Sequence, residues 1–143
     1  MIIDLQFFGQ TEKEKVSEAL KNNELPRKRF NKNIKLFNGL FENGVETPIE
    51  KVYNERDRFY HIVNGHPGTA YEKNFVNKLK DVLKNPDEIR ATKDRHGKSA
   101  NSYIKEIDGR PLMVVVRKGN IITAYEPKEK YMENNIKKKR RIL

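Results

Sequence analysis

The strongest constraint on the fold is a pair of tight-turn signals in the last third of the chain. Asp108-Gly109 and Gly119-Asn120 each separate stretches rich in β-branched and aromatic residues, and such dipeptides are typical of two-residue β-hairpin loops. Between them, residues 112–116 (LMVVV) form an unbroken apolar run, which indicates a central strand buried on both faces. The sequence therefore predicts an antiparallel meander. Its expected strands are residues 88–93, 101–107, 111–117 and 121–126.

The two hairpins also predict which side chains share a face of this sheet, because side chains alternate between faces along a strand. With two-residue loops, Tyr103 lies opposite Val114, and Val114 lies opposite Tyr125. A one-residue slip in either hairpin would change the assignment. One face is expected to carry Tyr103, Lys105, Thr123 and Tyr125, and the other Ile104, Met113, Val115, Ile122 and Ala124.

A helix is expected to cover the second of these faces. Residues 75–83 carry apolar side chains at helical spacing, with charged residues off the apolar stripe. Asn85-Pro86 ends the pattern. After the last strand, the tail from residue 128 onward also has a helical pattern, and it ends in the basic run KKKRR.

Two capping boxes predict helix starts in the first half of the chain. The TEKE stretch at residues 11–14 predicts a helix that ends at residues 22–23. The TPIE stretch at residues 47–50 predicts a short helix through residues 52–56. Between them, residues 27–46 fit either a helix or a strand.

The composition excludes several kinds of site. The chain has no cysteine, which excludes disulfides and thiolate chemistry, and it has no run of about 18 apolar residues that would span a membrane. Its opening stretch is apolar but too short for a signal peptide. A Gly-rich phosphate loop, a G-x-S-x-G elbow, an H-E-x-x-H pair and an acidic cluster for two Mg²⁺ ions are also missing. These absences argue against kinases, P-loop ATPases, serine hydrolases and metal-dependent nucleases, and we expect no metal and no cofactor.

Acid–base chemistry by histidine is the remaining candidate. His61 and His66 lie close together just before the predicted helix at residues 75–83, and an imidazole both takes and gives a proton near neutral pH. An isolated histidine is more often a surface or capping residue, and we interpret His96, which lies in a polar loop, in that way. Lys plus Arg total 30 against 20 acidic residues, and the resulting net charge of +10 favours a polyanionic partner, nucleic acid first.

Four short motifs follow one another around and after the two histidines. They are YHIVNGHP at residues 60–67, NPDEI at 85–89, YIK at 103–105 and ITAY at 122–125. In this order they resemble the HI…HP, P-D-x-I, Y-x-K and T-x-Y motifs of phage-borne nucleases of the barnase–EndoU–colicin–RelE (BECR) superfamily. The resemblance covers residues 59–127. Separately, the DLQFFG stretch near the N-terminus resembles the start of many proteins from phages and integrated elements.

This resemblance implies an α+β fold, in which N-terminal helices precede a four-stranded antiparallel meander packed on a helix, with a basic C-terminal helix or tail. We accordingly divide the chain into an N-terminal arm or helical extension (residues 1–46), a nuclease-like core domain (47–127) and a basic tail (128–143). The implied activity is that of a metal-independent endoribonuclease of the toxin or effector type. Such an enzyme cleaves RNA by 2′-OH transesterification and leaves a 2′,3′-cyclic phosphate.

The resemblance also implies roles for individual residues. His61 is the first candidate for general base or acid, and His66 is the second. Lys105 is the candidate cation at the phosphate, while Thr123 and Tyr125 are the candidate hydrogen-bond donors to it. The hairpin pairing puts Arg117 on the opposite face, although its place at a strand end keeps it within reach of the rim. The candidate RNA-binding residues are Tyr103, Arg117, Lys137, Lys138, Lys139, Arg140 and Arg141.

Other interpretations stay open on the sequence alone. The chain could be a non-catalytic nucleic-acid-binding or capsid-associated phage protein, and its basic tail could be a solvated, disordered end. A small ADP-ribosyl or nucleotide transferase toxin is a further alternative, although no dinucleotide-pocket motif is present. We expect RNA as the partner, tRNA included, together with an acidic antitoxin or immunity protein and no membrane. The expected location is the cytoplasm of a bacterial host cell, with association with a virion or delivery as the alternatives.

Overall fold

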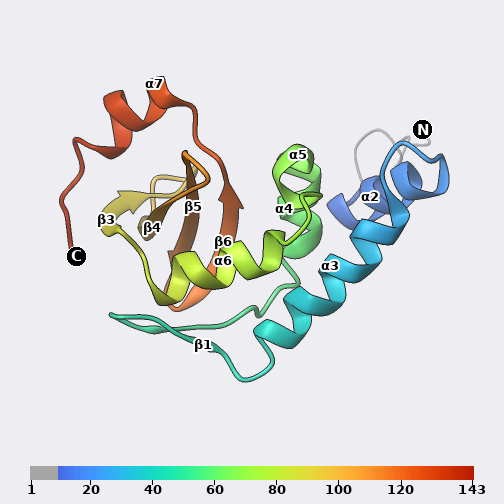
Figure 1. The fold of residues 1–143 in the computed structure, drawn as a ribbon, viewed down its shortest axis with the longest axis horizontal. Helices are drawn as coiled ribbons and strands as arrows, with labels where there is room; N and C mark the ends of the chain where they lie inside the picture. Colours follow the sequence, from blue (N-terminus) through green and yellow to red (C-terminus); the bar gives the residue numbers. More distant parts are fainter. Residues whose placement is uncertain (1–9) are drawn as a thin grey trace, which may run out of the picture.

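A four-stranded antiparallel sheet organises the fold (Figure 1). In the computed structural model, which describes residues 10–143, the strands follow one another in sequence order, as the two turn signals predict. The DLQFFG stretch at residues 4–9 lies outside the described residues. The strands are β3 (Glu88–Lys93), β4 (Ser99–Ile107), β5 (Arg110–Arg117) and β6 (Asn120–Tyr125).

Helices precede and follow this sheet, so the α+β prediction is confirmed. The ambiguous stretch at residues 27–46 forms mostly helix, and the tail begins as helix, as expected. The helices are α2 (Glu12–Lys21), α3 (Arg27–Leu40), α4 (Phe59–Gly65), α5 (Pro67–Ala70), α6 (Phe75–Lys84), α7 (Glu129–Tyr131) and the π-helix η1 (Met132–Ile136). Among the described residues, no helix is long and apolar enough to cross a membrane.

One capping box is confirmed and the other is not. The Thr11 hydroxyl accepts a hydrogen bond from the Glu14 amide at 3.1 Å and begins α2. The helix predicted through residues 52–56 is wrong, because Thr47 instead closes a tight turn between β1 (Val45–Glu46) and β2 (Lys51–Val52). The Thr47 hydroxyl still accepts from the Glu50 amide, at 3.0 Å, but the buried Val45 and Val52 pair as neighbouring strands.

The first hairpin of the sheet has the predicted register, and the second does not. Tyr103 lies opposite Val114, as expected. The second loop is Lys118-Gly119 rather than Gly119-Asn120, and both loop residues have positive φ, at 50° and 74°. This loop closes the hairpin one residue earlier than the dipeptide signal suggested.

A β-bulge then shifts the pairing of β5 with β6 once more, between Val115 and Val116. Val115 lies opposite Thr123, and Met113 lies opposite Tyr125. A bulge re-aims the side chains that follow it. Because of this shift, Thr123 and Tyr125 lie on the face opposite Tyr103, so the predicted grouping of these side chains is wrong.

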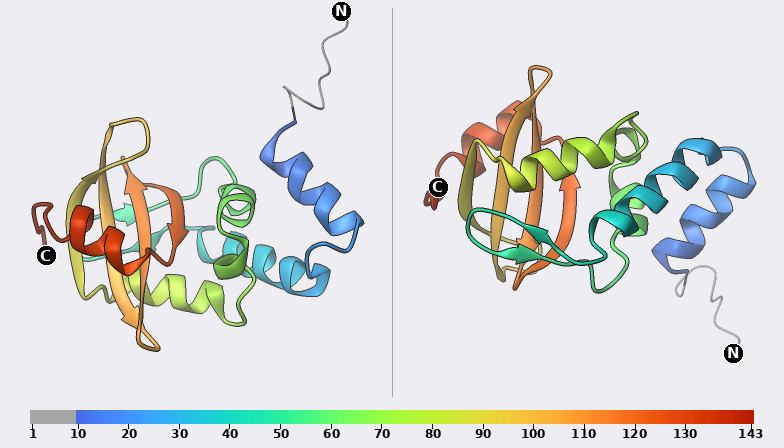
Figure 2. Two further views of the ribbon diagram at one scale, coloured as in Figure 1. Left: turned by 90° about the horizontal axis from the view of Figure 1, so that it is seen from above. Right: turned by 60° about the horizontal axis from the view of Figure 1, so that its bottom comes forward.

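The helix predicted over residues 75–83 forms, but it covers the other face of the sheet. The face under α6, called the inner face here, joins the main core. The opposite, outer face carries a smaller apolar cluster that the C-terminal helix covers at one end (Figure 2). The main-core residues of the inner face are Ile89, Tyr103, Leu112, Val114, Val116, Ile121 and Ala124, and the cluster of the outer face comprises Ala100, Ile104, Met113, Val115, Met132 and Ile136.

The N-terminal helices pack into the same main core. Phe30 and Phe37 of α3 each contact Phe59 of α4, with ring centroids 5.6 Å and 5.2 Å apart. Val16 of α2 is also buried in this core. The helices before the sheet therefore hold α4, which carries the sequence-predicted histidines, in a fixed place beside β6.

Candidate functional site

A cleft of about 920 Å³ opens on the outer face of the sheet, between α4 and the C-terminal segment. We call it the outer-face cleft. Cations far outnumber the two carboxylates among its lining residues, so an anionic ligand is favoured there. The lining cations are Arg56, Arg58, Lys93, Arg95, Lys98, Arg117 and Lys128, and the carboxylates are Asp94 and Glu126.

His66, at the C-terminal end of α4, lies flat against Tyr125 of β6 in this cleft. Their ring centroids are 4.4 Å apart and the planes differ by 13°. Burial lowers the pKa of the His66 imidazole, and the neighbouring His61 lowers it further. His66 is therefore a neutral ring near pH 7 and can accept a proton.

Tyr125 keeps its phenolic proton over the whole neutral range. Burial raises the pKa of the Tyr125 phenol well above its ordinary value, and the nearby Tyr131 of α7 raises it further. A protonated phenol is a hydrogen-bond donor. Tyr125 therefore offers the cleft both an aromatic face and an O–H donor.

His61 makes a contact that the sequence did not predict. Its Nδ1 lies 2.8 Å and 3.0 Å from the two carboxylate oxygens of Glu12, at the start of α2. A carboxylate only accepts hydrogen bonds, so Nδ1 carries the proton and Nε2 is left to exchange a proton with a ligand. The first turn of α2 is 49 residues away along the chain, and no local motif could have indicated this pairing.

Thr123 and Arg117 line the same cleft, in part because of the bulge between β5 and β6. The Thr123 hydroxyl is buried and has no hydrogen-bond partner within residues 10–143. Such a group costs free energy unless it is paired, so it is suited to contact a bound ligand. Arg117 lies at the end of β5 on the outer face with Met113 and Val115, the face on which the hairpin pairing placed it; Thr123 and Tyr125 are the side chains that lie on a different face from the predicted one.

Two of the candidate residues do not lie in the outer-face cleft. Tyr103 is fully buried on the inner face, where its hydroxyl donates to Glu50 at 2.6 Å. Lys105 donates to the Asn85 carbonyl at 2.8 Å and lies 3.8 Å from the Asp87 carboxylate. The sequence placed both side chains with Thr123 and Tyr125 because it assumed the wrong register for the second hairpin.

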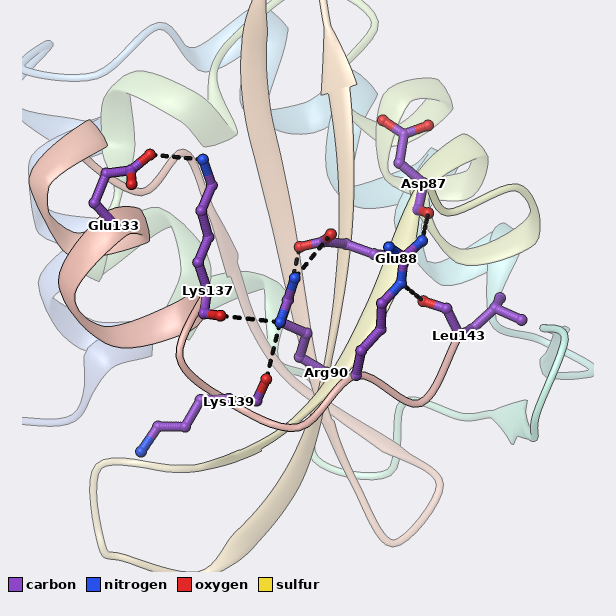
Figure 3. A network of polar contacts seen from close by, with 8 residues as sticks. Asp87, Glu88, Arg90, Glu133, Lys137, Lys139 and Leu143 are labelled. Carbon is purple, nitrogen blue, oxygen red and sulfur yellow. Dashed lines mark hydrogen bonds and ion pairs between the residues drawn. The ribbon is translucent and has the colours of Figure 1, made fainter.

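The five basic residues of the tail also lie outside this cleft. The Lys137 ammonium is 2.6 Å from Glu133 one turn earlier, and the backbone of the tail runs beside β3 (Figure 3). His96, in the β3–β4 loop, is exposed at the rim of the cleft. Among the residues described, no group of three or more His, Cys, Asp or Glu side chains could hold a metal ion.

The sequence of this chain matches the model of a known protein family. The model PBECR2, a phage-Barnase-EndoU-ColicinE5/D-RelE like nuclease 2, matches residues 27–142. The chain belongs to this family. The PBECR2 match spans α3 to the C-terminal tail and confirms the resemblance to BECR nucleases that the four motifs indicated. It begins after α2, so Glu12 lies outside the matched residues. No curated protein and no solved structure matches the chain.

Proposed function

We propose that the chain is a metal-independent endoribonuclease of the toxin or effector type, with its active site in the outer-face cleft. The observation that carries this proposal is a pair of imidazoles with different partners in one cation-rich cleft. His66 stacks on Tyr125, and His61 is hydrogen-bonded to Glu12. Two such groups can supply the base and the acid of one reaction, and the cations around them can bind a phosphate.

The proposed reaction is transesterification at an RNA phosphate. The 2′-oxygen attacks phosphorus while His66, neutral because burial lowers its pKa, accepts the 2′-hydroxyl proton. The bond from phosphorus to the 5′-oxygen then breaks, and His61, which acts as an imidazolium with its Nδ1–H held by Glu12, donates its Nε2 proton to that oxygen and is left neutral. The products are a 2′,3′-cyclic phosphate and a 5′-hydroxyl. A positioned acid or base of this kind contributes typically about 10²–10⁴-fold to the rate.

The remaining polar groups of the cleft would stabilise the charge of the phosphorane. Arg117 supplies a guanidinium that can bind two phosphate oxygens at once. Thr123 and Tyr125 would donate hydrogen bonds, and the buried Thr123 hydroxyl would gain the partner that it otherwise lacks. Charge and dipoles that are already in place before the reaction often contribute the largest share of the rate.

The experiment that tests this proposal is cleavage of bulk RNA in excess chelator, with analysis of the RNA ends. We expect cyclic-phosphate ends from the wild type, and a loss of at least about 100-fold in His61→Ala and in His66→Ala. Lys105→Ala is the matched control, because Lys105 lies on the other face of the sheet and is held by Asn85. It is expected to retain cleavage.

Other outcomes of this experiment would contradict the proposal. Cleavage that the chelator abolishes would point to a metal-dependent enzyme. RNA binding without cleavage, unchanged in both histidine variants, would favour the non-catalytic nucleic-acid-binding protein instead. A loss in Lys105→Ala as large as in His66→Ala would move the active site away from the outer-face cleft.

A further inference from the structure

A second, smaller groove lies at the edge of the sheet, beside the C-terminal tail. Its volume is about 500 Å³, and we call it the edge groove. Its lining residues include four cations and no carboxylate. The cations come from three different segments of the chain, namely Lys93 at the end of β3, Lys118 in the β5–β6 loop, and Lys139 and Arg140 in the tail.

The tail is fixed in this place by its backbone. Its chain adds to the free edge of β3, where the Ala91 amide donates to the Arg140 carbonyl at 2.8 Å and the Ile142 amide donates to the Ile89 carbonyl at 2.7 Å. The alternative of a disordered tail is therefore wrong for these residues. Because the pairing uses backbone groups, it leaves the Lys139 and Arg140 side chains free to bind a ligand. Lys137 is paired with Glu133, and the Arg141 guanidinium donates to the Leu143 and Asp87 carbonyls.

Arg90 of β3 fixes the start of the basic run within the tail. Its guanidinium donates to the Lys137 and Lys139 carbonyls, at 3.1 Å and 2.8 Å (Figure 3). Glu88 holds the same guanidinium at 2.9 Å. Glu88 thus neutralises Arg90, while the Lys139 ammonium extends away from this network (Figure 3). Within the described residues, no ion pair engages any of the four cations of the edge groove.

The edge groove adjoins the outer-face cleft, since Thr92 and Lys93 line both. We propose that the edge groove binds the phosphate backbone of a single-stranded polynucleotide whose reacting phosphate lies in the outer-face cleft. This inference rests on the proposed function and names its substrate class, a strand several nucleotides long rather than a mono- or dinucleotide. Grooves of cations that follow the backbone are the usual means of binding single strands without sequence preference.

A binding experiment tests this inference without depending on catalysis. The probe is a fluorescent, fully 2′-O-methylated RNA of about 12 nucleotides, which fits the usual range of single-strand site sizes and has no free 2′-hydroxyl to attack. The variant Lys118→Gln/Lys139→Gln/Arg140→Gln removes three of the groove's cations. The matched control, Lys28→Gln/Lys32→Gln/Lys35→Gln, removes the same charge from the exposed surface of α3. Circular dichroism checks that both variants fold.

The groove variant is expected to bind this RNA at least about tenfold more weakly than the wild type, with a salt dependence shallower by roughly 0.7 per lost phosphate contact. The ratio of the variant's affinity for this RNA to its affinity for a 2′-O-methyl trinucleotide should also be smaller than the same ratio for the wild type. The α3 control should lose less than about threefold, since its charges act only from a distance. Equal losses in the two variants would overturn the inference.

The outcomes also separate this inference from the proposed function. A wild type that binds the probe through the edge groove but cleaves no RNA would leave the groove assignment standing and contradict the nuclease assignment. A groove variant that binds the probe as the wild type does, yet loses binding to polyglutamate, would overturn the inference in favour of an acidic protein partner.

Discussion

At the scale of single residues, the contact between His61 and Glu12 is the part of the site that most depends on long-range folding. Glu12 lies in a helix outside the family match, and its carboxylate fixes which nitrogen of His61 carries the proton. The Glu12 side chain is 41% exposed, so water screens the pair in part. We therefore interpret Glu12 as a positioning residue that acts through His61, and we expect a smaller effect than a buried carboxylate would have.

Glu12→Gln is expected to lower kcat for RNA cleavage by about tenfold, because an amide can donate to Nδ1 as well as accept from it. In the neutral form of the ring, the ¹⁵N shifts of His61 should show a mixture of the two tautomers in the variant, where the wild type shows one. Glu14→Gln, in the same turn of α2 but exposed, is the control for helix stability. Unchanged His61 shifts in Glu12→Gln would contradict the role assigned to Glu12.

His66 predicts how stability depends on pH. Its pKa in the folded protein is lowered from 6.5 by burial and by His61, so it favours the folded state fully above the unfolded pKa. As the pH falls through the lowered pKa, the folded state must take up a proton at a cost, and the free energy of unfolding decreases. In urea titrations between about pH 7 and about pH 5, His66→Gln should lose less stability than the wild type. Parallel pH profiles would show that His66 is not the group responsible.

At the scale of elements, the second hairpin decides which side chains face the outer-face cleft. Its loop is held from outside the sheet, because the Tyr53 amide donates to the Gly119 carbonyl at 2.8 Å and the Ile121 amide donates to the Tyr53 carbonyl at 2.9 Å. A Cβ at Gly119 would lie 3.3 Å from the Lys51 carbonyl oxygen. Tyr53, in the segment after β2, is thus hydrogen-bonded both to the loop and to the start of β6, and these two bonds favour the observed register.

Gly119→Ala is expected to destabilise the fold more than Gly97→Ala does. Both glycines have φ near 75°, but a Cβ at Gly97 would meet no atom within 4 Å. Gly97→Ala should cost about 1 kcal/mol from its backbone conformation alone, and Gly119→Ala about 1–3 kcal/mol, because the Lys51 backbone must also move. Urea denaturation measures both. Equal losses would mean that the contact with Lys51 does not constrain the hairpin.

The elements that the sequence predicted well are those that local chemistry specifies. The four strands, α6 and the start of α2 follow from side-chain periodicity, turn residues and a capping threonine. The face assignment failed because it needed the loop position and the bulge, and neither has a local signal as strong as Asp108-Gly109. The same limit applies to the site. The motifs pointed to His61, His66, Thr123 and Tyr125, which line the outer-face cleft, whereas the contact of Glu12 with His61 depends on packing between distant segments.

At the scale of the whole molecule, the basic surface is divided between two places. The outer-face cleft holds cations beside the histidines, and the edge groove holds others beside the tail. With a net charge of +10, the chain attracts polyanions from a distance. The net charge of the chain accounts for this general attraction. The histidines line the outer-face cleft and not the edge groove, so under the proposed function a bound strand would react in the outer-face cleft.

The N-terminal helices are expected to unfold together with the sheet rather than as a separate arm. Phe30, Phe37 and Val16 lie in the same core as the α6 face of the sheet, so removing their contacts exposes that core. Unfolding in urea, followed by circular dichroism and by tyrosine fluorescence, should give coincident transitions, as single domains of this size usually do. A separate early loss of helical signal would mean that α2 and α3 form an arm that detaches first. In that case Glu12 would leave His61 before the sheet unfolds, and cleavage would be lost at a lower urea concentration than the sheet itself.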